Sequence, residues 1–132
     1  MTEQNINALF VVNNPEAILA DLKKFLLEGI SVMATDSEWD TTEYLLYDSS
    51  FDVVLLDIKV GKQNGLDILK RIKDDERIRR LPIVIFSDED NDETRKKAIE
   101  LGAVDFIVRS GLSSEYVVNK IKEIFIGGKY IA

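Results

Sequence analysis

Five short apolar runs alternate with amphipathic stretches along this 132-residue chain, and this alternation restricts its fold more than any other feature. The runs are rich in β-branched and aromatic residues, as buried strands are. They cover residues 8–12, 30–34, 53–56, 83–86 and 106–108. Strands that are apolar throughout indicate a sheet covered by helices on both faces. The sequence therefore predicts an α/β fold, a doubly wound (βα)5 sheet of five parallel strands.

The stretches between the runs carry apolar residues at helical spacing, which predicts helix faces packed on the sheet. The two clearest sets are Ile18, Leu19, Leu22, Phe25 and Leu26, and Val117, Val118, Ile121, Ile124 and Phe125.

Helix boundaries can be predicted from the residues that flank these sets. Asn14, Pro15 and Glu16 suit the N-cap, N1 and N2 positions of the first helix. Gly29 and Gly102 stand where helices end and the chain turns back into a strand. We expect one domain over residues 1–126, with residues 127–132 as a tail or the start of a linker.

Composition excludes several classes of function. Seventeen Lys and Arg against 24 Asp and Glu give a net charge of -7, which argues against direct binding to nucleic acid or an anionic membrane. With no Cys and no His, the chain has no thiol or imidazole chemistry, zinc finger or disulfide. No run approaches 18 apolar residues, so we expect a soluble, cytoplasmic protein.

Functional side chains of such a sheet lie beyond the carboxyl ends of its strands. Asn13 and Asn14 follow the first run, Asp57 follows the third, Ser87 the fourth and Arg109 the fifth. A carboxylate, a hydroxyl and a cation that converge from neighbouring strands suit an oxyanion or phosphoryl group.

At these positions the chain resembles the receiver domain of two-component response regulators, which has a flavodoxin-like fold, from about residue 8 to residue 125. Asp57, with Gly65 eight residues later, matches the phosphoacceptor and its loop. Ser87 matches the switch hydroxyl, Phe106 the switch aromatic residue, and Arg109 the position of the family's lysine. The resemblance implies a signalling module rather than an enzyme.

The chain departs from the family where receivers carry an acidic pair that binds Mg²⁺ together with the phosphoacceptor. Here Asn13 and Asn14, or Val12 and Asn13, stand in its place, and neither alignment supplies a carboxylate. Mg²⁺ prefers carboxylate oxygens in octahedral geometry, so we expect no cofactor beyond weak Mg²⁺ binding. Gly61 replaces a usual proline.

The remaining cations suggest what replaces the metal. Arg109 carries a planar guanidinium that can clamp Asp57 bidentately, and we expect that pair. Lys59 either places its ammonium in the metal space or lies in solvent. Asp88 is either a substitute metal ligand or part of a solvated acidic loop that leads into a helix.

The leading interpretation is therefore a degenerate receiver that acts through protein–protein contacts, with phosphorylation of Asp57 impaired or absent. Its expected partners are a sensor kinase, another signalling protein, or a second copy bound through the fourth helix, fifth strand and fifth helix. One alternative is the N-terminal receiver of a helix-turn-helix transcription regulator, suggested by residues 127–132. Another is an aspartyl-nucleophile phosphatase or phosphotransferase, which needs a second acid where Lys59 stands.

Overall fold

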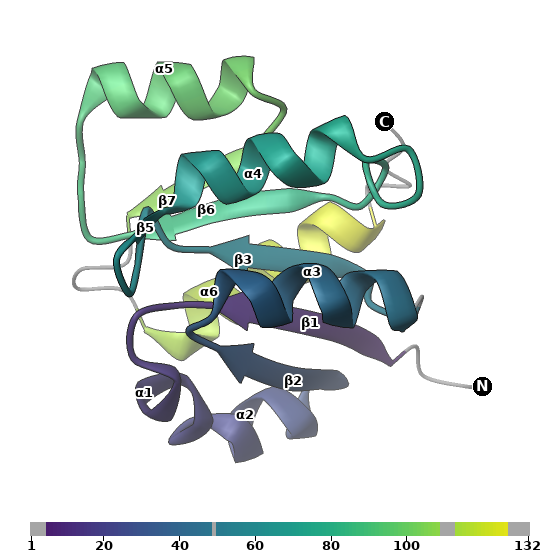
Figure 1. The fold of residues 1–132 in the computed structure, drawn as a ribbon. Helices are drawn as coiled ribbons and strands as arrows, with labels where there is room; N and C mark the ends of the chain where they lie inside the picture. Colours follow the sequence, from purple (N-terminus) through teal and green to yellow (C-terminus); the bar gives the residue numbers. More distant parts are fainter. Residues whose placement is uncertain (1–4, 49, 109–112, 127–132) are drawn as a thin grey trace.

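The computed structural model of this chain describes residues 5–48, 50–108 and 113–126 (Figure 1). Its strands are β1 (Ile6–Val11), β2 (Ile30–Thr35), β3 (Val53–Leu56), β4 (Lys59–Val60), β5 (Gln63–Asn64), β6 (Ile83–Ser87) and β7 (Asp105–Val108). Its helices are α1 (Pro15–Leu19), α2 (Leu22–Leu27), α3 (Glu38–Tyr47), α4 (Gly65–Asp74), α5 (Asp92–Glu100) and α6 (Ser114–Ile126).

Five of these strands form one parallel sheet in the order β2-β1-β3-β6-β7. Each of the five runs expected from the sequence forms one of these strands, with ends that differ by at most two residues. The prediction of a doubly wound five-stranded parallel sheet is therefore confirmed.

The sheet separates two apolar cores, because successive side chains of a strand point to opposite faces. Leu9 and Val11 of β1 join one core with residues of α3, α4 and α5. Ala8 and Phe10 of the same strand join the other core with residues of α2 and α6. Figure 1 shows this arrangement, with α3 and α4 on the near face and α6 behind the sheet. The predicted helix face of α6 is confirmed, since Val117, Val118 and Ile121 are buried.

The first helical segment differs from the prediction of one amphipathic helix. It is split into α1 and α2, because Asp21 leaves helical geometry with φ -103° and ψ 13°. Phe25 is buried, but Leu19 and Leu26 remain 44% and 52% exposed. The expectation that these two leucines pack on the sheet is wrong. The segment lies over β2 at the edge of the sheet, so its outer flank extends past the sheet.

The predicted helix boundaries are confirmed in position. Asn14 is the N-cap residue of α1 and Pro15 its first residue, although the Asn14 side chain makes no capping hydrogen bond. Gly29 and Gly102 follow α2 and α5 with φ of 81° and 110°, a left-handed conformation that favours glycine. Among the described residues, no helix is both long and apolar enough to span a bilayer.

The β4–β5 hairpin was not predicted from the sequence. Lys59 pairs with Asn64 and Val60 with Gln63, and Gly61 opens the tight turn between them with φ of 60°. Strands of two residues carry too little apolar periodicity to be recognised. The hairpin links β3 to α4 and lies at the carboxyl edge of the large sheet.

Candidate functional site

Asp57 and Ser87 lie at the carboxyl edge of the sheet, at the ends of two neighbouring strands. Asp57 follows Leu56, which pairs with Val11 on one side and with Ile85 on the other. Ser87 is the last residue of β6. Both polar residues are buried, with Asp57 only 4% exposed and Ser87 only 2% exposed. The sheet therefore brings together the carboxylate and the hydroxyl predicted from the sequence.

The backbone around Asp57 is fixed by hydrogen bonds on both sides. Its N–H donates to the carbonyl of Val11 at 2.8 Å, which continues the β1–β3 pairing by one residue. The N–H of Lys59 donates to the Asp57 carboxylate Oδ1 at 3.3 Å.

Gly65 at the start of α4 packs directly against the backbone of Asp57. A Cβ atom built on Gly65 would lie 1.8 Å from the Asp57 carbonyl oxygen, far inside van der Waals contact. The N–H of Gly65 also donates to the carbonyl of Ile58. The sequence pattern placed Gly65 eight residues after Asp57, and this close approach gives the spacing its physical reason.

The segment that follows β1 carries one apolar residue, Val12, and two amide residues, Asn13 and Asn14. Val12 is fully buried in the core, and both Asn13 and Asn14 are exposed. The Asn13 Oδ1 accepts a hydrogen bond from the N–H of Gly61 at 3.1 Å. This bond ties the loop after β1 to the hairpin after Asp57. The φ of Gly61, 60°, is one that proline cannot adopt.

Lys59 and Glu89 lie across the mouth of the site from one another. The Lys59 Nζ is 3.9 Å from the Glu89 Oε2, and the Lys59 side chain is 77% exposed. The Ser87 hydroxyl oxygen accepts from the N–H of Glu89 at 3.1 Å. Of the two interpretations of Lys59, the structure supports the solvated one.

Phe106 is a residue of β7, next to α5, and it is buried, with 6% of its surface exposed. The guanidinium carbon of Arg95 lies 4.8 Å from the centre of its ring. Sequence reasoning did not identify Arg95, because an arginine on an exposed helix face has the same pattern whether or not it covers an aromatic ring.

Two further residues, Arg109 and Asp88, were predicted to contribute to the site. Arg109 lies outside the described residues, so its expected pair with Asp57 stays a prediction. Asp88 is exposed at the start of the acidic loop before α5. Among the described residues, no three acidic side chains lie close enough together to bind one metal ion.

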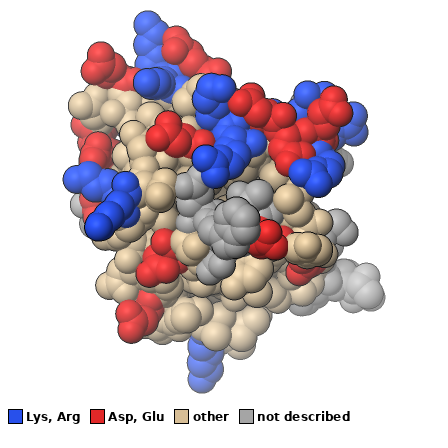
Figure 2. Space-filling model, viewed as in Figure 1, with Lys and Arg blue, Asp and Glu red and all other residues tan. Residues whose placement is uncertain are grey.

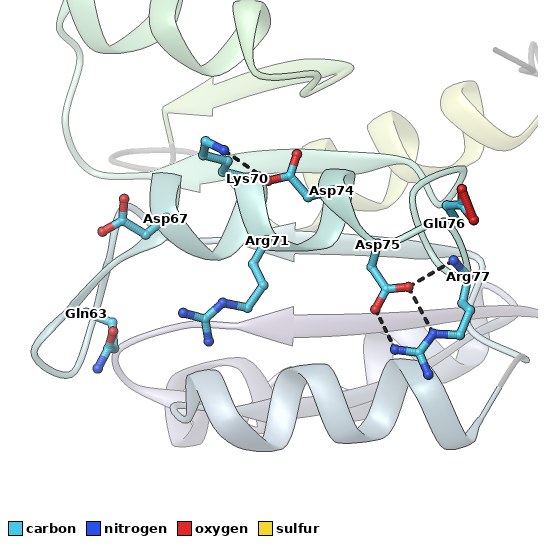
Figure 3. Close-up of a pocket in the computed structure, with 8 residues that line it drawn as sticks. All are labelled: Gln63, Asp67, Lys70, Arg71, Asp74, Asp75, Glu76 and Arg77. Carbon is cyan, nitrogen blue, oxygen red and sulfur yellow. Dashed lines mark hydrogen bonds and ion pairs between the residues drawn. The ribbon is translucent and has the colours of Figure 1, made fainter.

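A cavity lies along α4, away from Asp57 and Ser87. It measures about 790 Å³ and is lined by Gln63, Asp67, Lys70, Arg71, Asp74, Asp75, Glu76 and Arg77 (Figure 3). Lys70 pairs with Asp74 at 2.9 Å, and Arg77 pairs with Asp75 at 2.8 Å. Four acidic and three basic side chains line this cavity, so its net charge is too small to attract a strongly charged ligand.

The wider surface on the same side also mixes charges of both signs. Figure 2 shows Lys and Arg interspersed with Asp and Glu over the upper part of the molecule, where α4 and α5 lie. A surface of this kind suits contacts with another protein better than it suits a polyanion.

Comparisons with known proteins agree with this fold. A family model described as the response regulator receiver domain matches residues 9–121. A protein-glutamate methylesterase/protein-glutamine glutaminase of Chromohalobacter salexigens is 30% identical over 83% of this chain and 31% of its own length. The alginate biosynthesis transcriptional regulatory protein AlgB of Pseudomonas aeruginosa is 33% identical over 82% of this chain and 24% of its own length.

Solved structures show the same fold. The phosphorylated cyanobacterial phytochrome response regulator RcpA superposes with a TM-score of 0.79 and 22% identity, over 96% of this chain and 98% of that one. The methylesterase and AlgB are longer proteins than this chain. The chain spans about a third or less of the length of each, and its likeness to them is confined to that part.

Proposed function

This chain belongs to the response regulator receiver domain family of two-component signalling, and from that membership we propose that it is a receiver with an impaired phosphoacceptor site. In this proposal Asp57 occupies the phosphoacceptor position, and Ser87 and Phe106 occupy the switch positions. The module acts mainly through contacts with other proteins, and it is not an enzyme.

The observation that carries the proposal is the chemistry of the loop after β1. Val12 points into the core and Asn13 uses its side-chain oxygen to accept from the backbone of Gly61. Mg²⁺ is usually held by one or two carboxylates together with phosphate and water. A single carboxylate, Asp57, beside neutral amides does not fit this requirement. Two carboxylate charges are missing from the expected metal position. Each of them, at roughly 4 Å from the metal ion, would contribute about 4 kcal/mol of Coulomb attraction at an effective dielectric of 20, before desolvation is subtracted.

The contact surface in this proposal is the face formed by α5, β7 and α6. Ile99 of α5 and Tyr116 of α6 are 48% and 42% exposed there. Apolar and aromatic side chains of this kind are enriched at protein interfaces. The partners we propose are a sensor kinase, another signalling protein or a second copy of this chain.

A second proposal concerns the whole protein. The relatives that match most of this chain are longer, and one of them is a transcriptional regulatory protein. We therefore propose, as a second candidate, that the domain, residues 1–126, precedes an output domain and that residues 127–132 begin the linker. The sequence of the next 60 codons of the reading frame tests this directly. An aspartyl-nucleophile phosphatase is disfavoured, because the required second acid is replaced by the exposed Lys59.

The main experiment is incubation with acetyl phosphate, with and without Mg²⁺, followed by intact mass measurement. We expect little or no phosphorylated species and little dependence on Mg²⁺. A matched control replaces Asp57 with Asn, which removes the acceptor and defines the background. Rapid, Mg²⁺-dependent labelling that disappears in the Asp57→Asn variant would contradict the proposal.

Restoring the missing acids tests whether the rest of the site is intact. We expect Asn13→Asp combined with Asn14→Asp or with Val12→Asp to raise both Mg²⁺ affinity and acetyl phosphate labelling. Adding Arg109→Lys is expected to raise labelling further, because an ammonium is more compact than a guanidinium. If no variant labels faster than the parent chain, the position of Asp57 is not that of a dormant phosphoacceptor.

A further inference from the structure

Another cavity lies at the amino edge of the sheet, at the opposite end of the strands from Asp57 and Ser87. It measures about 370 Å³, and its lining includes Asp52 and Pro82, which directly precede the paired strands β3 and β6. The apolar side chains that line it are Leu45, Phe51, Ile78, Leu81 and Pro82. All of them are buried or partly buried. An apolar cavity of this size can accept one aromatic side chain of a partner.

Tyr47, the last residue of α3, adjoins this cavity without filling it. Its side chain is 84% exposed, the highest value among the large apolar and aromatic side chains of the described residues. Leu45 and Asp48, close to it in the sequence, both line the cavity. Because an α-helix turns about 100° per residue, Tyr47 projects roughly opposite to Leu45. The ring is therefore exposed to a partner and turned away from the cavity of its own chain.

Two opposite charges on the rim of the cavity can also pair with a partner. The Asp48 Oδ1 accepts from the hydroxyl and the N–H of Ser50, and these bonds hold the pKa of Asp48 below its usual range, so the carboxylate is charged at neutral pH. Arg80 is exposed, and in the part of the chain that the structure describes no carboxylate forms an ion pair with it. The neighbouring Arg77 is already paired with Asp75.

We propose that a second copy of this chain docks on this amino edge about a two-fold axis. Tyr47 of each copy enters the cavity of the other, and Asp48 of each copy pairs with Arg80 of the other. A two-fold interface requires a self-complementary patch. This patch carries both halves of each contact, an exposed ring beside an apolar cavity and a carboxylate beside a guanidinium. It is distinct from the face formed by α5, β7 and α6, and it does not depend on the state of the phosphoacceptor site.

The two rings supply most of the attraction in such a dimer. A buried aromatic side chain removes about 150–250 Å² from water, and aromatic anchors dominate the affinity of small interfaces. The net charge of -7 on each copy opposes association. At physiological salt this repulsion is screened beyond about 8 Å, whereas the close pair of Asp48 with Arg80 is screened less. The expected product is therefore a weak, reversible dimer.

Sedimentation equilibrium of the purified chain tests the proposal at about 0.15 M salt. From about 10 μM to about 1 mM, the range of weak interfaces, the mean mass should rise from that of the monomer toward twice that mass. Tyr47→Ala should raise the dissociation constant by about 30-fold or more, as for an aromatic hot spot. The matched control is Leu27→Ala on α2, which removes a side chain that is 75% exposed and should leave the dissociation constant unchanged.

A charge exchange tests the second contact. Arg80→Asp and Asp48→Arg should each raise the dissociation constant by about 10-fold or more, because each places like charges opposite one another across the axis. The chain with both substitutions should return to within about 3-fold of the parent. Asp48→Arg also removes the bonds to Ser50. A purely local effect of that loss would persist in the double variant, so recovery identifies the pair between the copies.

The remaining outcomes contradict the proposal. A chain that stays monomeric up to about 1 mM does not use this surface. A dimer that Tyr47→Ala leaves unchanged, or that the charge exchange does not restore, overturns the two-fold arrangement. A dimer weakened by Tyr116→Ala and not by Tyr47→Ala places the contact on the face formed by α5, β7 and α6 instead. These measurements use the unphosphorylated chain, so their result is independent of labelling by acetyl phosphate.

Discussion

At the scale of single residues, the contact between Gly65 and Asp57 gives the most direct prediction. Gly65→Ala would place a methyl group 1.8 Å from the Asp57 carbonyl oxygen, so either Asp57 or the start of α4 must move. We expect a loss of roughly 3 kcal/mol or more in the free energy of unfolding, as for severe overpacking. Urea denaturation measures this loss.

Gly61→Ala is the matched comparison for this variant. A Cβ on Gly61 meets nothing closer than 3.8 Å, so the variant is strained only by its positive φ. We expect a cost of about 1–2 kcal/mol from that strain. Equal losses in the two variants would show that close approach to Asp57 is not what requires glycine at position 65.

The pair expected between Arg109 and Asp57 can be tested by a double-mutant cycle. Arg109→Ala should destabilise the domain by about 1–3 kcal/mol, because it leaves the buried Asp57 without its proposed charge partner. Asp57→Asn combined with Arg109→Ala should recover much of that loss. A coupling energy near zero would mean that the two residues do not interact.

At the scale of elements, the starts of the helices differ in how they are capped. The Asn91 side chain accepts from two N–H groups of α5, at 2.9 and 3.1 Å. Asn91→Ala should therefore cost about 1 kcal/mol. Asn14 makes no capping hydrogen bond to α1, so Asn14→Ala should change the free energy of unfolding by only a few tenths of a kcal/mol. Thermal or urea unfolding compares the two, and a reversed order would contradict the capping assignment.

The docking of α6 on β7 includes an ion pair that predicts a pH dependence. The Lys120 Nζ lies 3.3 Å from the Asp105 Oδ2, and the Asp105 carboxylate raises the pKa of Lys120 above its usual 10.5. The folded protein therefore holds this proton more tightly than the unfolded chain does. The stabilisation is present from neutral pH up to about 10.5 and is lost as the pH rises through the raised pKa.

Lys120→Met tests this dependence while keeping the apolar stem of the side chain. Its free energy of unfolding should lie about 0.5–1 kcal/mol below that of the parent at pH 8, a figure reduced for solvent screening. The difference should shrink at pH 11. Lys96→Met, at an exposed position, serves as the control. A difference that is the same at both pH values would assign the effect to packing.

The elements also show what sequence reasoning could and could not reach. Strands buried on both faces leave an unmistakable apolar run, so all five strands of the sheet were predictable. The break at Asp21 left no such signal, because Ile18, Leu22 and Phe25 keep the spacing of one continuous helix. Asp57 and Ser87 were predictable because they stand at the carboxyl ends of apolar runs. Arg95 was not, since its role depends on a ring that is adjacent in space and distant in sequence.

At the scale of the whole molecule, we expect stability to be nearly independent of Mg²⁺. A site with a Kd of about 1 mM would add only about 0.4 kcal/mol at about 1 mM Mg²⁺. For a domain of this size that is a rise in Tm of about 1–3 °C. The variant with Asn13→Asp and Asn14→Asp is the positive control and should respond more strongly. A rise of many degrees in the parent chain would show that a metal site exists despite the missing acids.

The strand order also determines how this molecule can assemble as the ribosome releases it. β1, β2 and β3 are contiguous in the sheet, so all three strands of this half have been synthesised when the chain has reached Leu56. β6 then pairs with β3, and β7 with β6, so each later strand adds to an open edge and none must insert between two others. Synthesis from the N-terminus therefore supplies the strands in an order in which each can add to an existing edge, and we expect the long-range pairing of β1 with β3 to precede the addition of β6 and β7.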